Sequence, residues 1–96
     1  MDPTFTLKSK IWLWKGKAAW HFITIPKKLS TQIKSFDIPR KGFGSIKVKV
    51  TIGKTTWTTS IFPSKTGEYI LPLKKEVRKK ETLKAKDKVE LTFSLQ

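Results

Sequence analysis

The strictest alternation of apolar and polar residues in this chain runs from residue 46 to residue 52. Its apolar positions are Ile46, Val48, Val50 and Ile52, and its polar positions are Lys47, Lys49 and Thr51. Because side chains alternate between the two faces of a strand, this pattern predicts a strand with one buried face and one wet face. Gly53 and Lys54 follow it and suit a two-residue hairpin loop, with glycine at the position that needs a positive φ.

Five other segments have strand patterns, so six strands are predicted in all. These segments are residues 5–13, 18–25, 55–62, 69–73 and 87–95. In the second of them, Trp20 and Phe22 lie on one side and apolar residues also occupy the other, which predicts a strand covered on both faces. The last strand begins at Asp87, whose side chain is expected to bond to the local backbone and hold a turn.

A unit of strand, proline, basic helix and strand occurs twice. The first copy spans residues 22–50 and contains Pro26, and the clearer second copy spans residues 69–93 and contains Pro72. Pro26 fits the first turn of a helix, where its missing N–H is not needed. The apolar residues spaced for one helix face are Leu29 and Ile33 in the first copy and Leu73, Val77 and Leu83 in the second. Two short helices and an internal duplication are therefore predicted.

These elements predict a mainly β fold in one domain over residues 1–96. Two separate sheets of this size would each lack buried surface, so a closed or split barrel is favoured, and a barrel also removes exposed edges. The chain has no cysteine, and its core must rely on four Trp, six Phe and one Tyr. Trp20 and Trp57 are expected to fill the interior. Trp12 and Trp14 share their strand with lysines and are candidates for a partner surface.

The charge of the chain indicates an anionic partner. Its 21 Lys and Arg against 7 Asp and Glu give a formal net charge of +14, which attracts polyanions before any specific contact forms. The basic residues chosen as the candidate polyanion-contacting surface are Arg40, Lys41, Lys74, Lys75, Arg78, Lys79 and Lys80. Lysine dominates this set, and a lysine excess is equally typical of an A- and T-rich genome or of adaptation to heat.

Catalytic chemistry is poorly represented among the residues. The single histidine, His21, lies in a predicted strand and has no second histidine or cysteine to complete a dyad. Gly53, Lys54 and Thr55 resemble the end of a phosphate-binding loop, but the earlier glycine is missing and the segment is a hairpin. We therefore expect no catalytic residues, no metal and no cofactor. No apolar run approaches the roughly 20 residues of a membrane span, and a monomeric cytoplasmic protein without membrane contact is expected.

Nearly the whole chain resembles a bacterial and archaeal family described only as a domain of unknown function, DUF1905. The segments that carry the resemblance are 20–26, 42–53, 57–63, 67–73 and 77–79, with Asp87. The resemblance implies a double-split β-barrel, similar to the one that AbrB-type regulators and MazE-type antitoxins build by pairing two chains. One chain would then contain both halves. The family usually has glycine before the aspartate, where this chain has Lys86.

The function predicted from these observations is that of a non-catalytic β-barrel that binds nucleic acid or another polyanion weakly and without sequence preference. Lysines supply affinity for phosphates but carry no sequence information. The alternative is an interaction module that contacts another protein or domain and has no role with nucleic acid, its lysines being solvated. Likeness to DNA-binding regulators does not separate the two, because one fold hosts many functions.

Overall fold

The computed structural model describes residues 3–16, 19–36 and 44–96. These contain six strands and two helices, in the order β1 (Thr4–Lys15), β2 (Ala19–Thr24), α1 (Lys27–Lys34), β3 (Ile46–Ile52), β4 (Thr55–Pro63), β5 (Tyr69–Pro72), α2 (Lys75–Glu81) and β6 (Lys88–Leu95). No helix in these ranges is long and apolar enough to cross a membrane.

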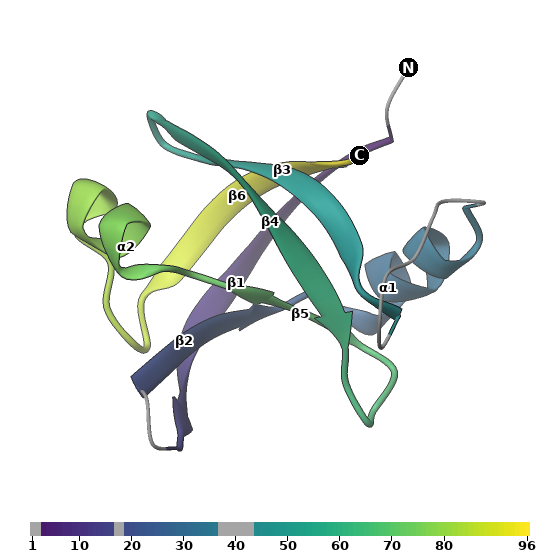
Figure 1. The fold of residues 1–96 in the computed structure, drawn as a ribbon, viewed down its shortest axis with the longest axis horizontal. Helices are drawn as coiled ribbons and strands as arrows, with labels where there is room; N and C mark the ends of the chain where they lie inside the picture. Colours follow the sequence, from purple (N-terminus) through teal and green to yellow (C-terminus); the bar gives the residue numbers. More distant parts are fainter. Residues whose placement is uncertain (1–2, 17–18, 37–43) are drawn as a thin grey trace.

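The six strands close into a barrel in the order β1-β2-β5-β4-β3-β6, and every neighbouring pair is antiparallel. Figure 1 shows the strands crossing around one interior, with α1 and α2 on opposite sides of it. The predicted mainly β barrel with two short helices is confirmed. Closure pairs the strands on both sides along much of their length, which satisfies their backbone groups without a second sheet.

The predicted internal duplication is also present in the strand order. One half consists of β1, β2, α1 and β3, and the other consists of β4, β5, α2 and β6. Exchanging the halves leaves the ring unchanged: β1 pairs with β2 as β4 pairs with β5, and β1 pairs with β6 as β4 pairs with β3. The halves meet where β2 pairs with β5 and where β3 pairs with β6. A single chain therefore contains two equivalent three-stranded units around one core.

The barrel interior is mostly aliphatic. β3 buries its apolar positions and exposes Lys47 and Lys49, as its alternation predicts. The buried apolar residues that the six strands contribute to this core are Leu7, Ile11, Ile23, Ile46, Val48, Val50, Ile52, Trp57, Ile61, Tyr69, Leu71, Val89, Leu91, Phe93 and Leu95. Around this core, the helix faces predicted from spacing contribute buried Ile33 and Val77.

One of the two tryptophans expected inside the barrel is outside it. Trp57 is only 9% exposed and belongs to the core, whereas Trp20 is 50% exposed, so that expectation was wrong for Trp20. The register explains the difference, because Ile23 lies opposite Ile11 on the inside and the period of two then turns Trp20 outward. For the same reason β2 is not covered on both faces along its whole length.

The side chain of Asp87 bonds to the local backbone and holds the turn between α2 and β6, as predicted. The Asp87 carboxylate accepts a hydrogen bond from the backbone N–H of Lys84 at 3.0 Å, and the backbone N–H of Asp87 donates to the Lys84 carbonyl at 3.1 Å. The turn is tied to β1 because the N–H of Lys86 donates to the carbonyl of Ile11 at 2.7 Å. Lys86 has a φ of 79°, a left-handed conformation that glycine adopts more readily than a residue with a Cβ.

The hairpin between β3 and β4 is fixed by Gly53. This glycine has a φ of 57°, as its place in the loop predicts. A Cβ at Gly53 would collide with the Glu81 carboxylate at the end of α2. The same carboxylate accepts a hydrogen bond from the Thr55 hydroxyl at 2.6 Å, so the hairpin and α2 are held together.

Candidate functional site

An aromatic surface covers the outer face of the β1–β2 hairpin. Trp14 lies opposite Trp20 and Trp12 lies opposite Phe22 in the antiparallel register, so the four rings share one face. Trp12 and Phe22 have ring centroids 5.1 Å apart, and Trp20 and Phe22 have centroids 5.9 Å apart with nearly parallel planes. We call these four residues the aromatic face.

The rings of the aromatic face are held in place from below. Phe22 is 8% exposed and forms the floor, while Trp14 is 51% exposed and Trp20 is 50% exposed. The indole Nε1–H of Trp12 donates to the Thr24 hydroxyl at 2.9 Å, which fixes that ring. Trp14 lies so close to the bare backbone of Gly16 that a Cβ there would overlap its six-membered ring. The face is therefore organised before any ligand binds.

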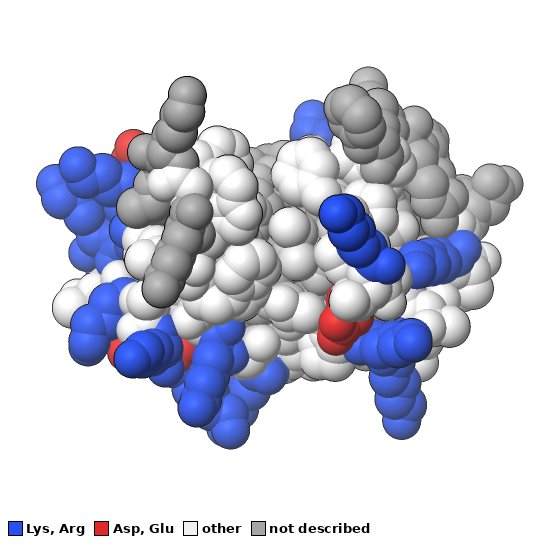
Figure 2. All heavy atoms as spheres, turned by 90° about the horizontal axis from the view of Figure 1, so that it is seen from below, with Lys and Arg blue, Asp and Glu red and all other residues white. Residues whose placement is uncertain are grey.

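The aromatic face opens onto a cleft of about 590 Å³, whose lining also includes Lys65 and Ile70. Figure 2 shows the side of the molecule that looks down in Figure 1: uncharged surface occupies much of its middle, while Lys and Arg lie mainly toward its left, lower and right margins. Exposed apolar surface that is bordered by charge is typical of binding sites rather than of the ordinary surface of a soluble protein.

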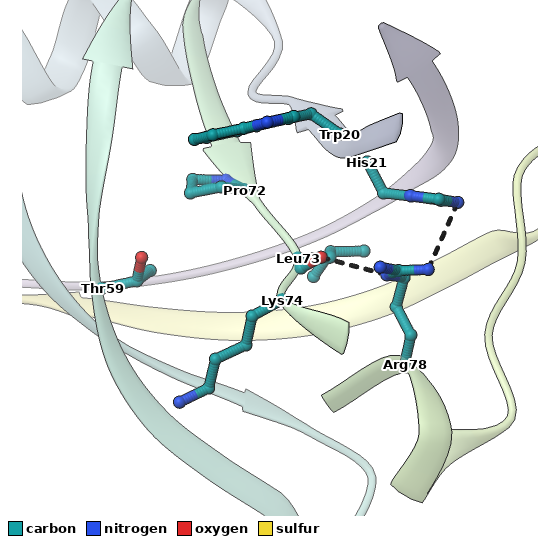
Figure 3. A pocket seen from close by; sticks show the side chains of 7 residues that line it. All are labelled: Trp20, His21, Thr59, Pro72, Leu73, Lys74 and Arg78. Atoms are coloured by element: carbon teal, nitrogen blue, oxygen red, sulfur yellow. Dashed lines mark hydrogen bonds between the residues drawn. The ribbon is translucent and has the colours of Figure 1, made fainter. Parts of the chain in front are cut away.

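A second, more polar cavity lies where β4 and β5 separate. These strands pair only at Phe62 with Ile70 and at Pro63 with Tyr69. Beyond these pairs the strands diverge and leave a cavity of about 310 Å³. Its walls are formed by Trp20, His21, Thr59, Pro72, Leu73, Lys74 and Arg78, as Figure 3 shows. We call it the Arg78 cavity.

Arg78 is held rigidly at the edge of this cavity. Its Nε–H donates to the Leu73 carbonyl at 3.1 Å, and its Nη1 lies 3.5 Å from Nε2 of His21. Figure 3 shows Arg78 and His21 pointing toward each other. Neither Arg78 nor Lys74 forms an ion pair with a carboxylate in the described part of the chain. The cavity therefore has a fixed guanidinium and an ammonium whose charges no described carboxylate neutralises.

The predicted polyanion-contacting residues fall into separate places. Lys74 and Arg78 line the Arg78 cavity, and Lys75, Arg78 and Lys79 line a second hollow of about 360 Å³. Lys80 is exposed on α2 but lines neither. Arg40 and Lys41 lie outside the described residues. Of the predicted residues on or next to α2, four therefore line one of these two hollows, and Arg78 lines both.

Two features of the site were not anticipated from the sequence. The outward position of Trp20 was missed, although it has the same parity in β2 as Phe22, which lies opposite Trp12. The contact of His21 with Arg78 joins residues 57 positions apart and has no signal in the local pattern. Among the residues that the structure describes, no group of three or more His, Cys, Asp or Glu is placed to hold a metal ion.

The fold and its surface define a small closed β-barrel built from two equivalent halves, with an aromatic outer face. The sequence from residue 7 to residue 93 matches the family described as a domain of unknown function, DUF1905, and the chain belongs to that family. This confirms the resemblance to DUF1905 noted from the sequence. No curated protein matches the chain.

Proposed function

We propose that this protein is a non-catalytic domain that binds single-stranded nucleic acid without sequence preference. The observation that carries the proposal is the aromatic face: three tryptophans and a phenylalanine on the outside of a barrel whose chain has a net charge of +14. Bases would stack on the exposed rings of Trp14 and Trp20, and phosphates would lie against the lysines and arginines at the margins.

Single strands suit this surface better than a duplex does. The flat face of a base is accessible only when the base is unstacked, and stacking on an aromatic side chain contributes roughly 1–3 kcal/mol per base. Every base has such a face, so the interaction tolerates any sequence. The cleft also places Lys65 beside the aromatic rings, where its ammonium is available to a backbone phosphate.

We also propose that the protein acts in the cytoplasm as a monomer. Its two equivalent halves would correspond to the two chains that pair in AbrB-type regulators and MazE-type antitoxins. The strand order supports this comparison of architecture, since the halves are related as two copies would be. It says nothing about where a ligand binds, because folds of one kind host many functions.

A second function, docking of another protein, is favoured by the composition of the same cleft. Apart from Lys65, its walls are apolar: Trp12, Trp14, Trp20, Phe22 and Ile70. Tryptophan is enriched among the residues that dominate binding energy in protein interfaces. In this alternative, the partner would place an apolar side chain in the cleft and acidic groups against the basic margins.

Fluorescence anisotropy with labelled oligonucleotides tests the proposal. A mixed-sequence single strand of about 12 nucleotides should bind with a dissociation constant of about 1–100 μM at moderate salt, and a duplex of the same sequence should bind more weakly. Trp14→Ala and Trp20→Ala should each weaken binding of the single strand about five-fold or more, as loss of about 1 kcal/mol per stacked base requires.

Lys49→Gln is the matched control for charge. Lys49 is exposed on β3, which lines neither the cleft nor the Arg78 cavity, so this variant should bind nearly as the unchanged protein does. Absence of binding at low salt would reject the proposal and favour docking of a protein. Equal loss in Trp20→Ala and Lys49→Gln would also reject it, because binding would then depend on charge alone.

A further inference from the structure

The Arg78 cavity differs from the aromatic cleft in the chemistry of its walls. Polar and charged groups converge on it from β2, β4 and the start of α2, whereas the cleft is apolar except for Lys65. We infer that the Arg78 cavity is a subsite for a phosphomonoester attached to a planar ring, the chemistry shared by a free mononucleotide and by the phosphorylated end of a single strand.

The guanidinium of Arg78 is arranged to bind an oxyanion. Of its five N–H donors, one goes to the Leu73 carbonyl and one is directed at His21, so three stay available to a ligand. Two parallel N–H donors on a planar guanidinium match two oxygens of a phosphate, and this geometry is stronger when the side chain is already fixed. The hydrogen bond to Leu73 supplies that fixation, because it ties the side chain to the backbone between β5 and α2.

The charge of the cavity favours a monoester over the diester of a strand interior. A phosphomonoester carries about 1.5 to 2 negative charges near neutral pH, and a diester carries about one. Arg78 and Lys74 together offer two positive charges, and no carboxylate lines the described walls of the cavity. Thr59, which lies on the inward face of β4 between Trp57 and Ile61, adds a hydroxyl that is available to a phosphate oxygen.

The apolar side of the cavity accommodates a planar ring. Trp20 and Pro72 form one wall, which Figure 3 shows on the side away from Lys74 and Arg78. Trp20 also lines the aromatic cleft, so the two sites are continuous at this residue. The volume of about 310 Å³ is at the lower end of the range for small-molecule sites, which suits a single nucleotide.

Isothermal titration calorimetry with three probes tests the subsite. Adenosine 5′-monophosphate contains both the phosphomonoester and the ring, adenosine lacks the phosphate, and inorganic phosphate lacks the ring. The monophosphate should bind at least ten-fold more tightly than either of the others. Arg78→Gln should weaken its binding about ten- to hundred-fold, as loss of a charged hydrogen-bonding partner predicts, while Lys49→Gln should have little effect.

Two further variants guard against a folding defect in Arg78→Gln. Arg78→Lys keeps the charge but lacks the planar fork, and Lys74→Gln removes an exposed charge at the cavity. Both should weaken binding of the monophosphate more than Lys49→Gln does, with unfolding temperatures close to that of the unchanged protein. Equal binding of adenosine and its monophosphate would overturn the inference. So would equal binding of the monophosphate to the Lys74 and Lys49 variants.

The strand-end form of the inference rests on the proposed function, and the mononucleotide form does not. Comparing a single strand that has a 5′-phosphate with the same strand that has a 5′-hydroxyl separates them. A preference of at least five-fold for the phosphorylated strand, lost in Arg78→Gln, supports the strand-end form. If both strands bind equally and the monophosphate does not bind, the subsite fails while the proposed function stands. If only the monophosphate binds, the proposed function fails while the subsite stands.

Discussion

Replacing Lys86 by glycine should stabilise the barrel. Lys86 has a φ of 79°, and only Thr82 among the other non-glycine residues of the described chain also has a positive φ. Its backbone N–H donates to Ile11 at 2.7 Å, an interaction that glycine would keep. The lysine side chain is exposed, so its removal uncovers no core.

The magnitude follows from two opposing effects. A left-handed conformation costs a residue with a Cβ about 1–2 kcal/mol, and glycine avoids this cost. Glycine also has more freedom in the unfolded chain, which costs about 0.5–1 kcal/mol on folding. The difference between these two effects lies between about 0 and 1.5 kcal/mol, so the expected gain for Lys86→Gly in the free energy of unfolding is centred on about 0.5–1 kcal/mol. In a domain of this size, that corresponds to a rise of roughly 2–8 °C in the unfolding temperature.

Urea and thermal unfolding, followed by tryptophan fluorescence and circular dichroism, measure this change. Lys49→Gly is the control, since it removes the same charge from an exposed strand position whose backbone is extended. Glycine inside a strand should lower the free energy of unfolding by about 0.5–1 kcal/mol. The two variants should therefore move in opposite directions. If Lys86→Gly destabilises the protein as Lys49→Gly does, the assignment of backbone strain to Lys86 is refuted.

Four other substitutions test the core and the aromatic face. Ser30→Ala should lower the free energy of unfolding by about 1–3 kcal/mol in urea titrations, because the fully buried Ser30 hydroxyl donates to a backbone carbonyl and accepts from the N–H of Tyr69 at 3.0 Å. Trp57→Ala should lower the free energy of unfolding by about 3–5 kcal/mol because it truncates the core, whereas Trp14→Ala should lower it by less than about 1 kcal/mol. Similar losses in the two variants would contradict the buried position of Trp57 and the exposed position of Trp14. Gly16→Ala should displace the Trp14 ring and weaken binding of a single strand while leaving the unfolding temperature nearly unchanged; unaltered binding would show that this ring position does not matter.

Local sequence patterns predicted much of the fold. The alternation over residues 46–52 predicted the burial of β3, and glycine in the following pair predicted its hairpin with β4. The repeated strand, proline and helix unit predicted two equivalent halves, which the strand order confirms. Pro26 directly precedes α1 as expected, although Pro72 remains in β5 and α2 begins only at Lys75. These predictions succeed because turn chemistry and side-chain period act over a few residues.

The candidate site was accessible from the sequence only in part. Its chemistry was visible as basic residues around Arg78 and as tryptophans at positions 12 and 14. The sequence pattern did not show which residues these side chains contact. In the structure, His21 lies beside Arg78 and Trp20 lies opposite Trp14. Such contacts depend on strand register and on where β4 leaves β5, and neither has a local signal.

Composition and periodicity alone established the number of strands, the two helices, their repetition and the excess of positive charge. They could not establish which face of β2 lies inside the barrel, because a period of two distinguishes two faces without saying which one meets the core. The pairing of Ile11 with Ile23 settles that question and turns Trp20 outward. Closure of the barrel then brings distant parts of the chain to one cavity, because the tilt and stagger of each strand depend on those of all the others.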